Sequence, residues 1–363
     1  MIKLIKPYIE YEEVVEEFKD IFESGWFTKG RYVEEFKELL KEYTGAKHAF
    51  LTTSATTALS MCLKLLNIGV GDEVIVSDFS FPATANVVED LGAIPVFADV
   101  DLESFNMLPS ELEKKITPKT KAVIFVDALG NISGIHAIKA ICQQHNIPLI
   151  EDAACAIGSS EYGIKSGNIA DMTCFSFHPR KLLTTGEGGA ITTNNDIWAE
   201  RLEIKLNHGA TVKDGKIDFV DFGYNFRMSE IQAVMGIKQL RRLDGIVDSR
   251  LQVRDQYIRA LNPLGFVPQS IHDQVKYNVQ SLVFLVPEGT IRDRLVEFLK
   301  MRNIESTLGT YSLSGTTYYA KKYDTIQQNG SYLENNTITL PCYWEVDVEE
   351  VVNNIKEFYE QQL

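Results

Sequence analysis

Cysteine is scarce in this sequence of 363 residues, and the few cysteines follow no recognisable framework. There is no Cys-x-x-Cys pair, and the number of cysteines is odd. Disulfide scaffolds and structural zinc sites both need cysteines in paired, regularly spaced positions. We therefore expect reduced thiols and no metal site. The five cysteines are Cys62, Cys142, Cys155, Cys174 and Cys342.

Long apolar runs and an excess of positive charge are also missing. No segment approaches the roughly 20 apolar residues of a membrane span, and the N-terminal segment MIKLIKPYIEYEEVVEEF lacks the apolar stretch of a signal peptide. The 36 lysines and arginines are outnumbered by 50 acidic residues, which gives a net charge of -14. Such a charge repels nucleic acid and anionic membranes. We expect a cytoplasmic protein with neither as a partner.

What the sequence does contain is a regular alternation of apolar, strand-like runs with helical patterns from about residue 48. With 45% hydrophobic residues, the chain can form a large core. Continuous apolar runs indicate strands that are buried on both faces, as in a mostly parallel sheet between helices. The seven predicted strands are AFLTT (49–53), EVIVSD (73–78), IPVFADV (94–100), KAVIFVDA (121–128), IPLIEDA (147–153), MTCFSF (172–177) and GAITTN (189–194).

The pattern changes after Met228. One or two long helices are predicted over residues 229–262, followed by the strand SLVFLV, a helix, a loop rich in Gly, Ser, Thr and Tyr, and a final amphipathic helix. This order indicates a smaller α+β domain. We predict a large domain over residues 12–245 and a small domain over residues 246–363, with residues 1–11 packing on the small one.

Three segments whose side chains could bind a ligand or take part in catalysis follow predicted strands, at the edge where α/β sheets bind ligands. The first, LTTSATTAL, places Ser54, Ala55 and Thr56 at the start of a helix, where free N–H groups and the helix dipole attract an anion. A serine that merely caps the helix explains the same residues. The second, IPLIEDAACA, ends a buried strand on Glu151 and Asp152, whose charge needs a cationic partner or a capping role.

The third segment, CFSFHPRKLLTTGEGGAITT, carries Lys181 between a strand and a glycine-rich turn. A partly desolvated lysine at the mouth of a site has a lowered pKa and can form a Schiff base. A lone lysine in a loop is more often simply solvated, so the interpretation depends on its neighbours. The glycines at 186, 188 and 189 are typical of a turn with unusual backbone angles.

Taken together, these segments resemble the DegT/DnrJ/EryC1/StrS family of sugar aminotransferases. The resemblance extends from GWFTKG (25–30) to about residue 243 and includes TSATTAL (53–59), IEDAACAIGS (150–159), CFSFHPRKLLTTGEGGAI (174–191) and GYNFRMSEIQA (223–233) in order. It implies the type I fold of enzymes that use pyridoxal 5′-phosphate (PLP): a large domain with a mostly parallel seven-stranded sheet and a smaller α+β C-terminal domain.

The resemblance also implies roles for individual residues. Lys181 matches the lysine that binds PLP covalently, and Asp152 matches the acid that pairs with the pyridine nitrogen. Asn225 matches a residue that reaches the phosphate from the neighbouring subunit, which implies a homodimer with shared sites. The remaining matches concern cofactor binding: the phosphate turn Ser54, Ala55 and Thr56, the phosphate-binding hydroxyl of Ser176, and Phe81, which stacks on the pyridine ring.

Two positions depart from the family pattern. Cys155 stands near the cofactor ring, where Gln or His is usual, and Ala55 stands where Gly is frequent in the phosphate turn. Alanine still offers its N–H group, so we expect phosphate binding to be retained. At position 155 the usual polar contact with the cofactor is missing from the pattern.

The implied reaction transfers an amino group, with L-glutamate as the expected donor, to C3 or C4 of a nucleotide-linked keto-deoxysugar. Such products serve surface-polysaccharide, glycan and other amino-sugar biosynthesis. Candidate substrate contacts lie in residues 25–31 and 305–320, with Gly309, Tyr311 and Tyr318 among them. One alternative is a sugar dehydratase of the same fold, which is disfavoured because a histidine replaces the lysine in that branch. Another is a non-catalytic regulator.

Overall fold

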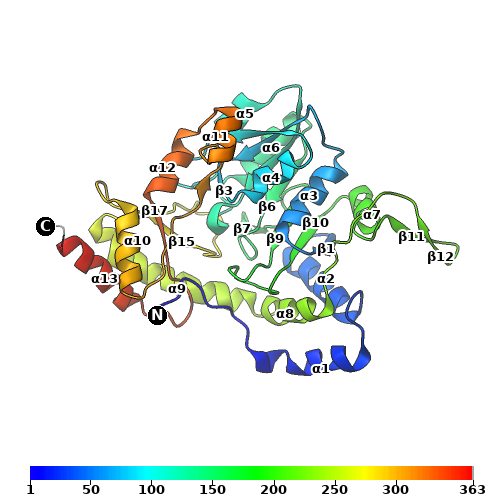
Figure 1. Ribbon diagram of the computed structural model, residues 1–363, viewed down its shortest axis with the longest axis horizontal. Coiled ribbons are helices and arrows are strands. Elements are labelled where there is room, and N and C mark those ends of the chain that lie inside the picture. Colours follow the sequence, from blue (N-terminus) through cyan, green and yellow to red (C-terminus); the bar gives the residue numbers. More distant parts are fainter. Residues whose placement is uncertain (362–363) are drawn as a thin grey trace.

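A seven-stranded sheet forms the centre of the computed structural model, which describes residues 1–361 (Figure 1). β10 runs antiparallel to both of its neighbours, β1 and β9, whereas the other neighbouring strands are parallel. All seven predicted strands are therefore present in one mostly parallel sheet. In spatial order they are β1 (His48–Thr52), β10 (Gly189–Thr193), β9 (Met172–Ser176), β6 (Leu149–Asp152), β5 (Thr120–Val126), β2 (Glu73–Ser77) and β4 (Ile94–Ala98).

Helices cover both faces of this sheet. Alternate residues of each strand point to opposite faces, so Ile150 and Cys174 pack with one helical layer while Leu149 and Phe175 pack with the other. The first layer contains α3 (Ala55–Leu65), α4 (Ala83–Glu89) and α7 (Asp196–Lys205). The second contains α2 (Arg31–Thr44), α5 (Pro109–Lys115), α6 (Ile135–Gln144) and α8 (Glu230–Leu240), and α1 (Val15–Ser24) lies against α8.

Local signals in the sequence explain where the helices at the site begin. Ser54 caps α3 by accepting a hydrogen bond from the Thr57 N–H, and the Thr57 side chain returns a contact to the Ser54 backbone. Ser229 and Gln232 form the same reciprocal capping box at the start of α8. These caps place the N-terminus of α3 directly after β1, at the edge where β6 and β9 also end.

The C-terminal part has its own core around an antiparallel three-stranded sheet, β13 (Val267–Pro268), β15 (Leu282–Leu285) and β17 (Thr337–Leu340). α10 (Arg292–Met301) and α13 (Val348–Glu360) pack on this sheet. The long helical region consists of two helices, α8 and α9 (Leu243–Leu261). Because α9 runs across residue 245, the proposed boundary stays a prediction, and residues 362–363 of the small domain lie outside the described part.

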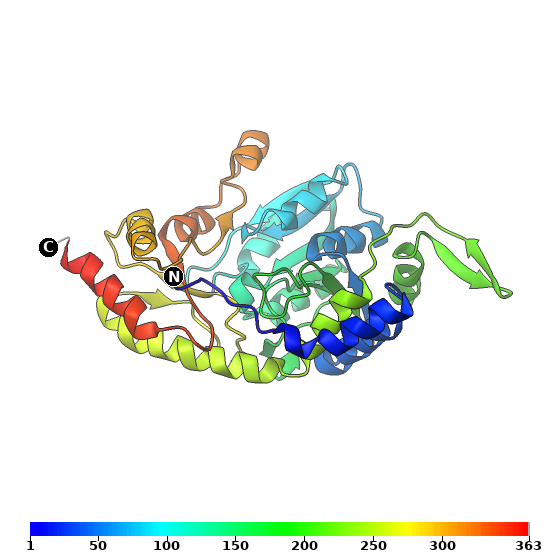
Figure 2. The same ribbon diagram turned by 60° about the horizontal axis from the view of Figure 1, so that its bottom comes forward.

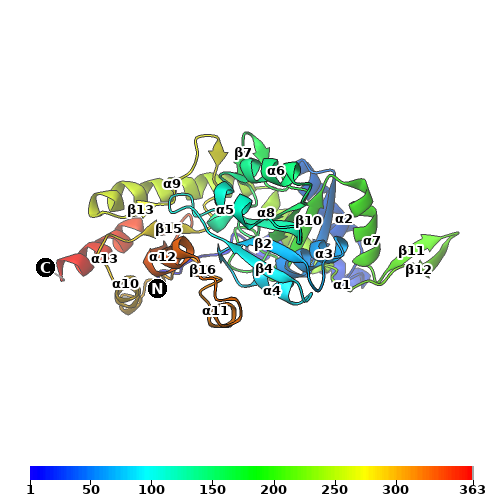
Figure 3. The same cartoon turned by 90° about the horizontal axis from the view of Figure 1, so that it is seen from above.

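The prediction of a loop after α10 is wrong. Residues 311–340 contain β16 (Tyr311–Ser312), α11 (Thr317–Tyr323), α12 (Gln328–Asn336) and β17. β16 pairs with β3 (Phe79–Ser80) in a separate two-stranded sheet, so this segment crosses back to the chain just after β2 (Figure 3). The sequence of this segment looked like a loop because its elements are short and rich in small polar residues. Side-chain contacts stabilise these elements, so they show no periodic pattern of apolar residues.

Smaller elements complete the fold. The hairpin β11 (Ala210–Lys213) and β12 (Lys216–Phe219) projects from one end of the molecule (Figure 2). The N-terminal residues lie along the C-terminal part, where Ile2 bridges to Ile304 and the Leu4 carbonyl accepts from the Cys342 N–H. No helix within residues 1–361 has both the length and the apolar character needed to cross a membrane. The remaining elements are β7 (Ser160–Glu161), β8 (Ile164–Lys165), β14 (Val275–Lys276) and the 3-10 turns η1 (Tyr11–Glu13), η2 (Ala128–Gly130) and η3 (Asn262–Leu264).

Candidate active site

A cavity of about 550 Å³ lies at the carboxyl ends of β5, β6 and β9, within the range of small-molecule sites. Its lining includes the start of α3, residues 79–84, and residues 307–311 and 339–340 of the C-terminal part. Residues 79–80 and 311–312 are paired as β3 and β16, so these two lining segments are neighbours. The structure brings most of the predicted site residues together here, although their chemical roles stay predictions. Those in the lining are Ser54, Ala55, Thr56, Phe81, Asp152, Cys155, Ser176 and Lys181.

The start of α3, which lines the cavity, has the features of an anion-binding site. The Thr57 N–H is occupied by the Ser54 cap, whereas the N–H groups of Ala55 and Thr56 belong to the first turn and have no intrahelical acceptor. Gly189 packs so closely that a side-chain Cβ would lie 2.6 Å from the Ala55 nitrogen. Together with the nearby hydroxyl of Ser176, these groups can hold a phosphate at the positive end of the helix dipole.

Asp152 is the buried carboxyl group of the cavity. Its side chain accepts a hydrogen bond from Thr84 Oγ1 at 2.8 Å and a second from the Ala154 N–H at 3.2 Å. Burial raises the pKa of this carboxyl, while the hydrogen bonds and the charge of Lys181 oppose that rise. A cationic ring nitrogen placed beside Asp152 would therefore supply the counter-charge that burial demands.

Lys181 lies in the irregular segment between β9 and β10, and its amine points to Cys155. The Lys181 Nζ donates a hydrogen bond to Cys155 Sγ at 3.1 Å. Cys155, the position that departs from the family pattern, thus contacts the lysine itself in this chain. The thiol is half-buried and lines the same cavity.

Two aromatic side chains, Phe81 and Tyr311, also line the cavity. The Phe81 side chain is 65% exposed, and its ring centroid lies 6.4 Å from that of Tyr311. Gly309 and Tyr311 line the cavity as predicted for substrate contacts. Tyr318 does not; it lies on α11, where its hydroxyl donates to Glu89 at 3.3 Å.

Asn225 lies outside the cavity lining and is exposed. It bridges to Asn207, whose side chain also accepts hydrogen bonds from Lys29 Nζ at 2.5 Å and from Arg227 at 3.5 Å. The role predicted for Asn225 requires a second subunit, so a position outside its own cavity agrees with that role without testing it.

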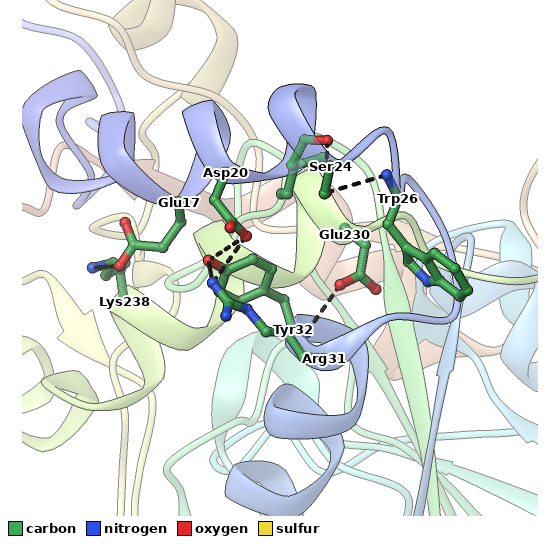
Figure 4. Close-up of polar contacts among 9 residues, drawn as sticks. Glu17, Asp20, Ser24, Trp26, Arg31, Tyr32, Glu230 and Lys238 are labelled. Atoms are coloured by element: carbon green, nitrogen blue, oxygen red, sulfur yellow. Dashed lines mark hydrogen bonds and ion pairs between the residues drawn. The ribbon is translucent and has the colours of Figure 1, made fainter.

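The predicted substrate segment 25–31 is likewise absent from the lining of its own chain's cavity. Figure 4 shows how Glu230 at the start of α8 holds it. The buried Glu230 carboxylate accepts hydrogen bonds from the Gly30 N–H at 2.8 Å and the Tyr32 N–H at 2.9 Å. Trp26, in the same segment, is 62% exposed.

The lining residues that sequence reasoning missed include the polar residues Thr84, Asp127, Arg250 and Gln280. Thr84 follows Phe81 at helical spacing, so its approach to the site could have been found. Arg250 and Gln280 come from helical and strand patterns of the C-terminal part, which carry no signal for a contact with Lys181. A second hollow of about 700 Å³ lies over α9 and residues 269–277, but it is shallow and contains none of the predicted residues.

Comparison with known proteins agrees with this geometry. The chain matches the model of the DegT/DnrJ/EryC1/StrS aminotransferase family over residues 8–358. It is 33% identical to the spore coat polysaccharide biosynthesis protein SpsC of Bacillus subtilis (strain 168), over 97% of this chain and 95% of SpsC. It is 31% identical to GDP-perosamine synthase of Vibrio cholerae, over 99% of each chain. The PLP form of Spr1654 of Streptococcus pneumoniae, described as a sugar aminotransferase, has a TM-score of 0.93 and 28% identity, with coverage of 100% and 99%.

Fold and comparisons together define a PLP-dependent aminotransferase with the type I fold. Within that class, the chain belongs to the DegT/DnrJ/EryC1/StrS aminotransferase family. The predicted fold class, enzyme class and cofactor are thereby confirmed. The cavity fits PLP, because a buried carboxyl, a free helix N-terminus and a lysine amine face the same space.

Proposed function

We propose that this aminotransferase transfers an amino group from L-glutamate to C3 or C4 of a nucleotide-linked keto-deoxysugar. The observation that carries the proposal is the cavity that joins Lys181, Asp152 and the start of α3 to the open segment 307–311. The names of two relatives, GDP-perosamine synthase and a spore coat polysaccharide biosynthesis protein, support an amino-sugar product. We place the reaction in the cytoplasm, in surface-polysaccharide, glycan or other amino-sugar biosynthesis.

When bound, PLP supplies an aldehyde that condenses with amines and a ring that withdraws electrons from the donor's Cα. In this proposal, Lys181 Nζ takes the proton from that Cα and later returns a proton to the sugar carbon. Asp152 holds the positive charge of the ring nitrogen. The N–H groups of Ala55 and Thr56, with the Ser176 hydroxyl, hold the phosphate, and Phe81 covers one face of the ring.

The absorption spectrum of the PLP-loaded protein tests this proposal. L-Glutamate should replace the visible band of the lysine-bound cofactor with the pyridoxamine band, and the right nucleotide-linked keto-sugar should restore it. Borohydride reduction followed by peptide mapping should place the cofactor on Lys181. A visible band that no amino donor changes would favour the dehydratase or the regulator and would overturn the proposal.

We further propose that the enzyme is a homodimer whose sites are shared. Segment 25–31, Asn207, Asn225 and Arg227 gather on one face, beyond the lining of their own chain's cavity. The nearby hairpin β11–β12 exposes apolar side chains, including Ile217 at 71% and Phe219 at 68%. A second copy would cover such a patch.

Subunit mixing tests the shared site. Lys181→Ala and Asn225→Ala dimers should each be nearly inactive. After the subunits exchange, a mixed dimer has one intact site, so about a quarter of wild-type activity should return. No recovery, although sedimentation shows that mixed dimers have formed, would mean that each site is complete within one chain.

A further inference from the structure

A buried tripeptide of the C-terminal part, Asn278-Val279-Gln280, reaches under the candidate active site. It lies between β14 and β15, and all three residues are buried. Its neighbours are the segments that carry Lys181 and Cys155, about a hundred residues earlier in the chain. We call these three residues the bracket.

Gln280 forms hydrogen bonds with the backbone on both sides of Lys181. Its side-chain Oε1 accepts a hydrogen bond from the Leu182 N–H at 2.8 Å, and its Nε2 donates to the Arg180 carbonyl at 2.9 Å. Lys181 lies in neither a helix nor a strand, so regular backbone pairing does not fix its Cα. Instead, the side-chain amide of Gln280 fixes the position of this backbone by hydrogen bonding to the N–H and C=O groups that flank Lys181.

Asn278 holds the other partner of the lysine contact. Its Nδ2 donates to the Cys155 carbonyl at 2.8 Å and to the Ile157 carbonyl at 2.9 Å. The bracket therefore holds the backbone of Cys155 at one end and that of Lys181 at the other. These are the two residues whose side chains meet at 3.1 Å in the cavity.

Val279, between them, has a φ of 55°, a left-handed backbone angle that is unfavourable for a β-branched residue. Such strain persists only where the surroundings enforce it, and it concentrates at functional sites. Here the buried Arg250 enforces it, because its Nε donates to the Val279 carbonyl at 2.7 Å and its Nη2 to the Gln280 carbonyl at 3.0 Å.

We propose that Gln280 is a positioning residue for Lys181, and that Asn278 and the Arg250-locked Val279 keep it in register with Cys155. The proposal rests on Lys181 being the cofactor lysine. A purely structural role would only stabilise the loop. Gln239 on α8 offers the matched control, because its amide grips Thr184 in the same way, three residues beyond Lys181, accepting at 3.0 Å and donating at 2.6 Å.

The first test replaces Gln280 with methionine, which keeps the length of the side chain but removes both hydrogen bonds. Hydrogen exchange of the apoenzyme should show the Leu182 N–H exchanging at least about tenfold faster. In the PLP-loaded enzyme, kcat should fall on the order of ten- to a hundredfold with little change in KM. Gln239→Met should lower thermal stability to a similar degree, yet change kcat less than about threefold.

The second test is Gln280→Glu, which also serves if the methionine variant fails to fold. Burial favours the neutral carboxyl, which can accept from Leu182 and donate to Arg180. Therefore kcat and the protection of the Leu182 N–H should approach wild-type values at low pH and fall as the carboxyl ionises at higher pH. An unchanged kcat in this variant at a pH where the Leu182 N–H has lost its protection would overturn the proposal, as would equal effects of the two methionine variants on kcat.

Borohydride mapping separates this proposal from the function on which it rests. If the cofactor maps to Lys181 but the Gln280 variants change neither exchange nor kcat, Gln280 has no positioning role. If the cofactor maps to another lysine, the assigned site itself is wrong, and with it the purpose inferred for the bracket.

Discussion

Two parts of the cavity lining, which we call the cofactor end and the sugar end after the roles proposed for them, are built in different ways. At the cofactor end, Asp152 and Ser176 terminate strands of the central sheet and are only 5% and 8% exposed. At the sugar end, Gly309 and Tyr311 belong to a segment of the C-terminal part that pairs, through the two-residue strands β16 and β3, with the chain just after β2 and outside the central sheet. One end therefore rests on the most buried elements of the fold, whereas the other rests on a short, local attachment.

If the proposed roles hold, this difference should separate chemistry from substrate choice. Residues at the ends of buried strands cannot move without disturbing the core, so the cofactor end is held rigidly. The segment 307–311 belongs to no strand of the central sheet, so we expect that small shifts of this segment would leave that sheet unchanged. Changes at the cofactor end should therefore abolish both half-reactions, whereas changes at the sugar end should affect only the acceptor.

The largest effect is expected from Lys181→Ala. Loss of the amine removes both the covalent attachment of the cofactor and the acid-base group, so kcat should fall on the order of 10⁴-fold or more. Binding of a nucleotide-linked sugar, measured by calorimetry, should stay within about threefold of wild type because the sugar end is intact. Residual turnover above about 1% of wild type would remove Lys181 from the mechanism.

Asp152→Asn should come next. Without the carboxylate charge, the ring nitrogen loses its counter-ion, and both half-reactions should slow by 10²- to 10³-fold, which corresponds to about 3–4 kcal/mol. Rapid-mixing absorbance with L-glutamate and with the sugar acceptor measures each half separately. Because burial already disfavours this charge, the melting temperature should not fall by more than a few degrees. An unchanged rate in either half-reaction would contradict the role assigned to Asp152.

The same contrast explains what could be predicted from the sequence. The seven strands and the start of α3 were found because continuous apolar runs, a Ser cap and their order along the chain are local signals. The same signals led to Asp152 and Lys181, which lie in the cavity lining while their roles stay predictions. Gln280 and Arg250 were not, because they act through side-chain contacts with backbone groups, and Gln280 lies 98 positions from its partner Leu182. Such contacts leave no periodic pattern.

The elements of residues 311–340 were missed for a related reason. β16 is two residues long and is held by Asp78, which accepts hydrogen bonds from Ser312 Oγ and the Ser314 N–H, both at 2.7 Å. Asp78 follows β2 and binds a segment more than 230 residues later in the chain. Neither stretch of sequence alone predicts this contact. The sugar end thus depends on a buried charge that the sequence does not reveal.

That attachment should depend on pH. Burial, reinforced by the charge of Asp99, raises the pKa of Asp78 from its ordinary 3.8 to about 6. Because the folded state holds this proton more tightly, the stabilising contribution is complete below pH 3.8 and is lost as the pH rises through 6. Asparagine cannot ionise, so the stability of Asp78→Asn relative to wild type should grow between pH 4 and 7, by about 3 kcal/mol at most. Urea unfolding across this range measures the difference.

A constant difference between Asp78→Asn and wild type would mean that Asp78 does not titrate in this range. The amide of asparagine can still accept from the Ser314 N–H and donate to Ser312 Oγ, so the segment should remain attached. The spectrum of bound PLP should not change with this substitution, because Asp78 lies outside the lining of the cavity. A shifted spectrum would show that the two ends of the cavity are coupled.

The smallest effect, and the most selective, is expected from Gly309→Ala. The added Cβ would lie 2.5 Å from Thr337 Oγ1 and 3.3 Å from Phe79, so segment 307–311 must shift by a few tenths of an ångström. KM for the sugar acceptor should rise about tenfold, while the half-reaction with L-glutamate stays unchanged. Gly315→Ala, whose Cβ approaches nothing closer than 3.3 Å from Ser312 Oγ, is the control within the same segment. If Gly309→Ala slows the glutamate half-reaction as much as the sugar half-reaction, a shift of segment 307–311 also affects the residues at the cofactor end. The proposed separation of chemistry from substrate choice would then be wrong.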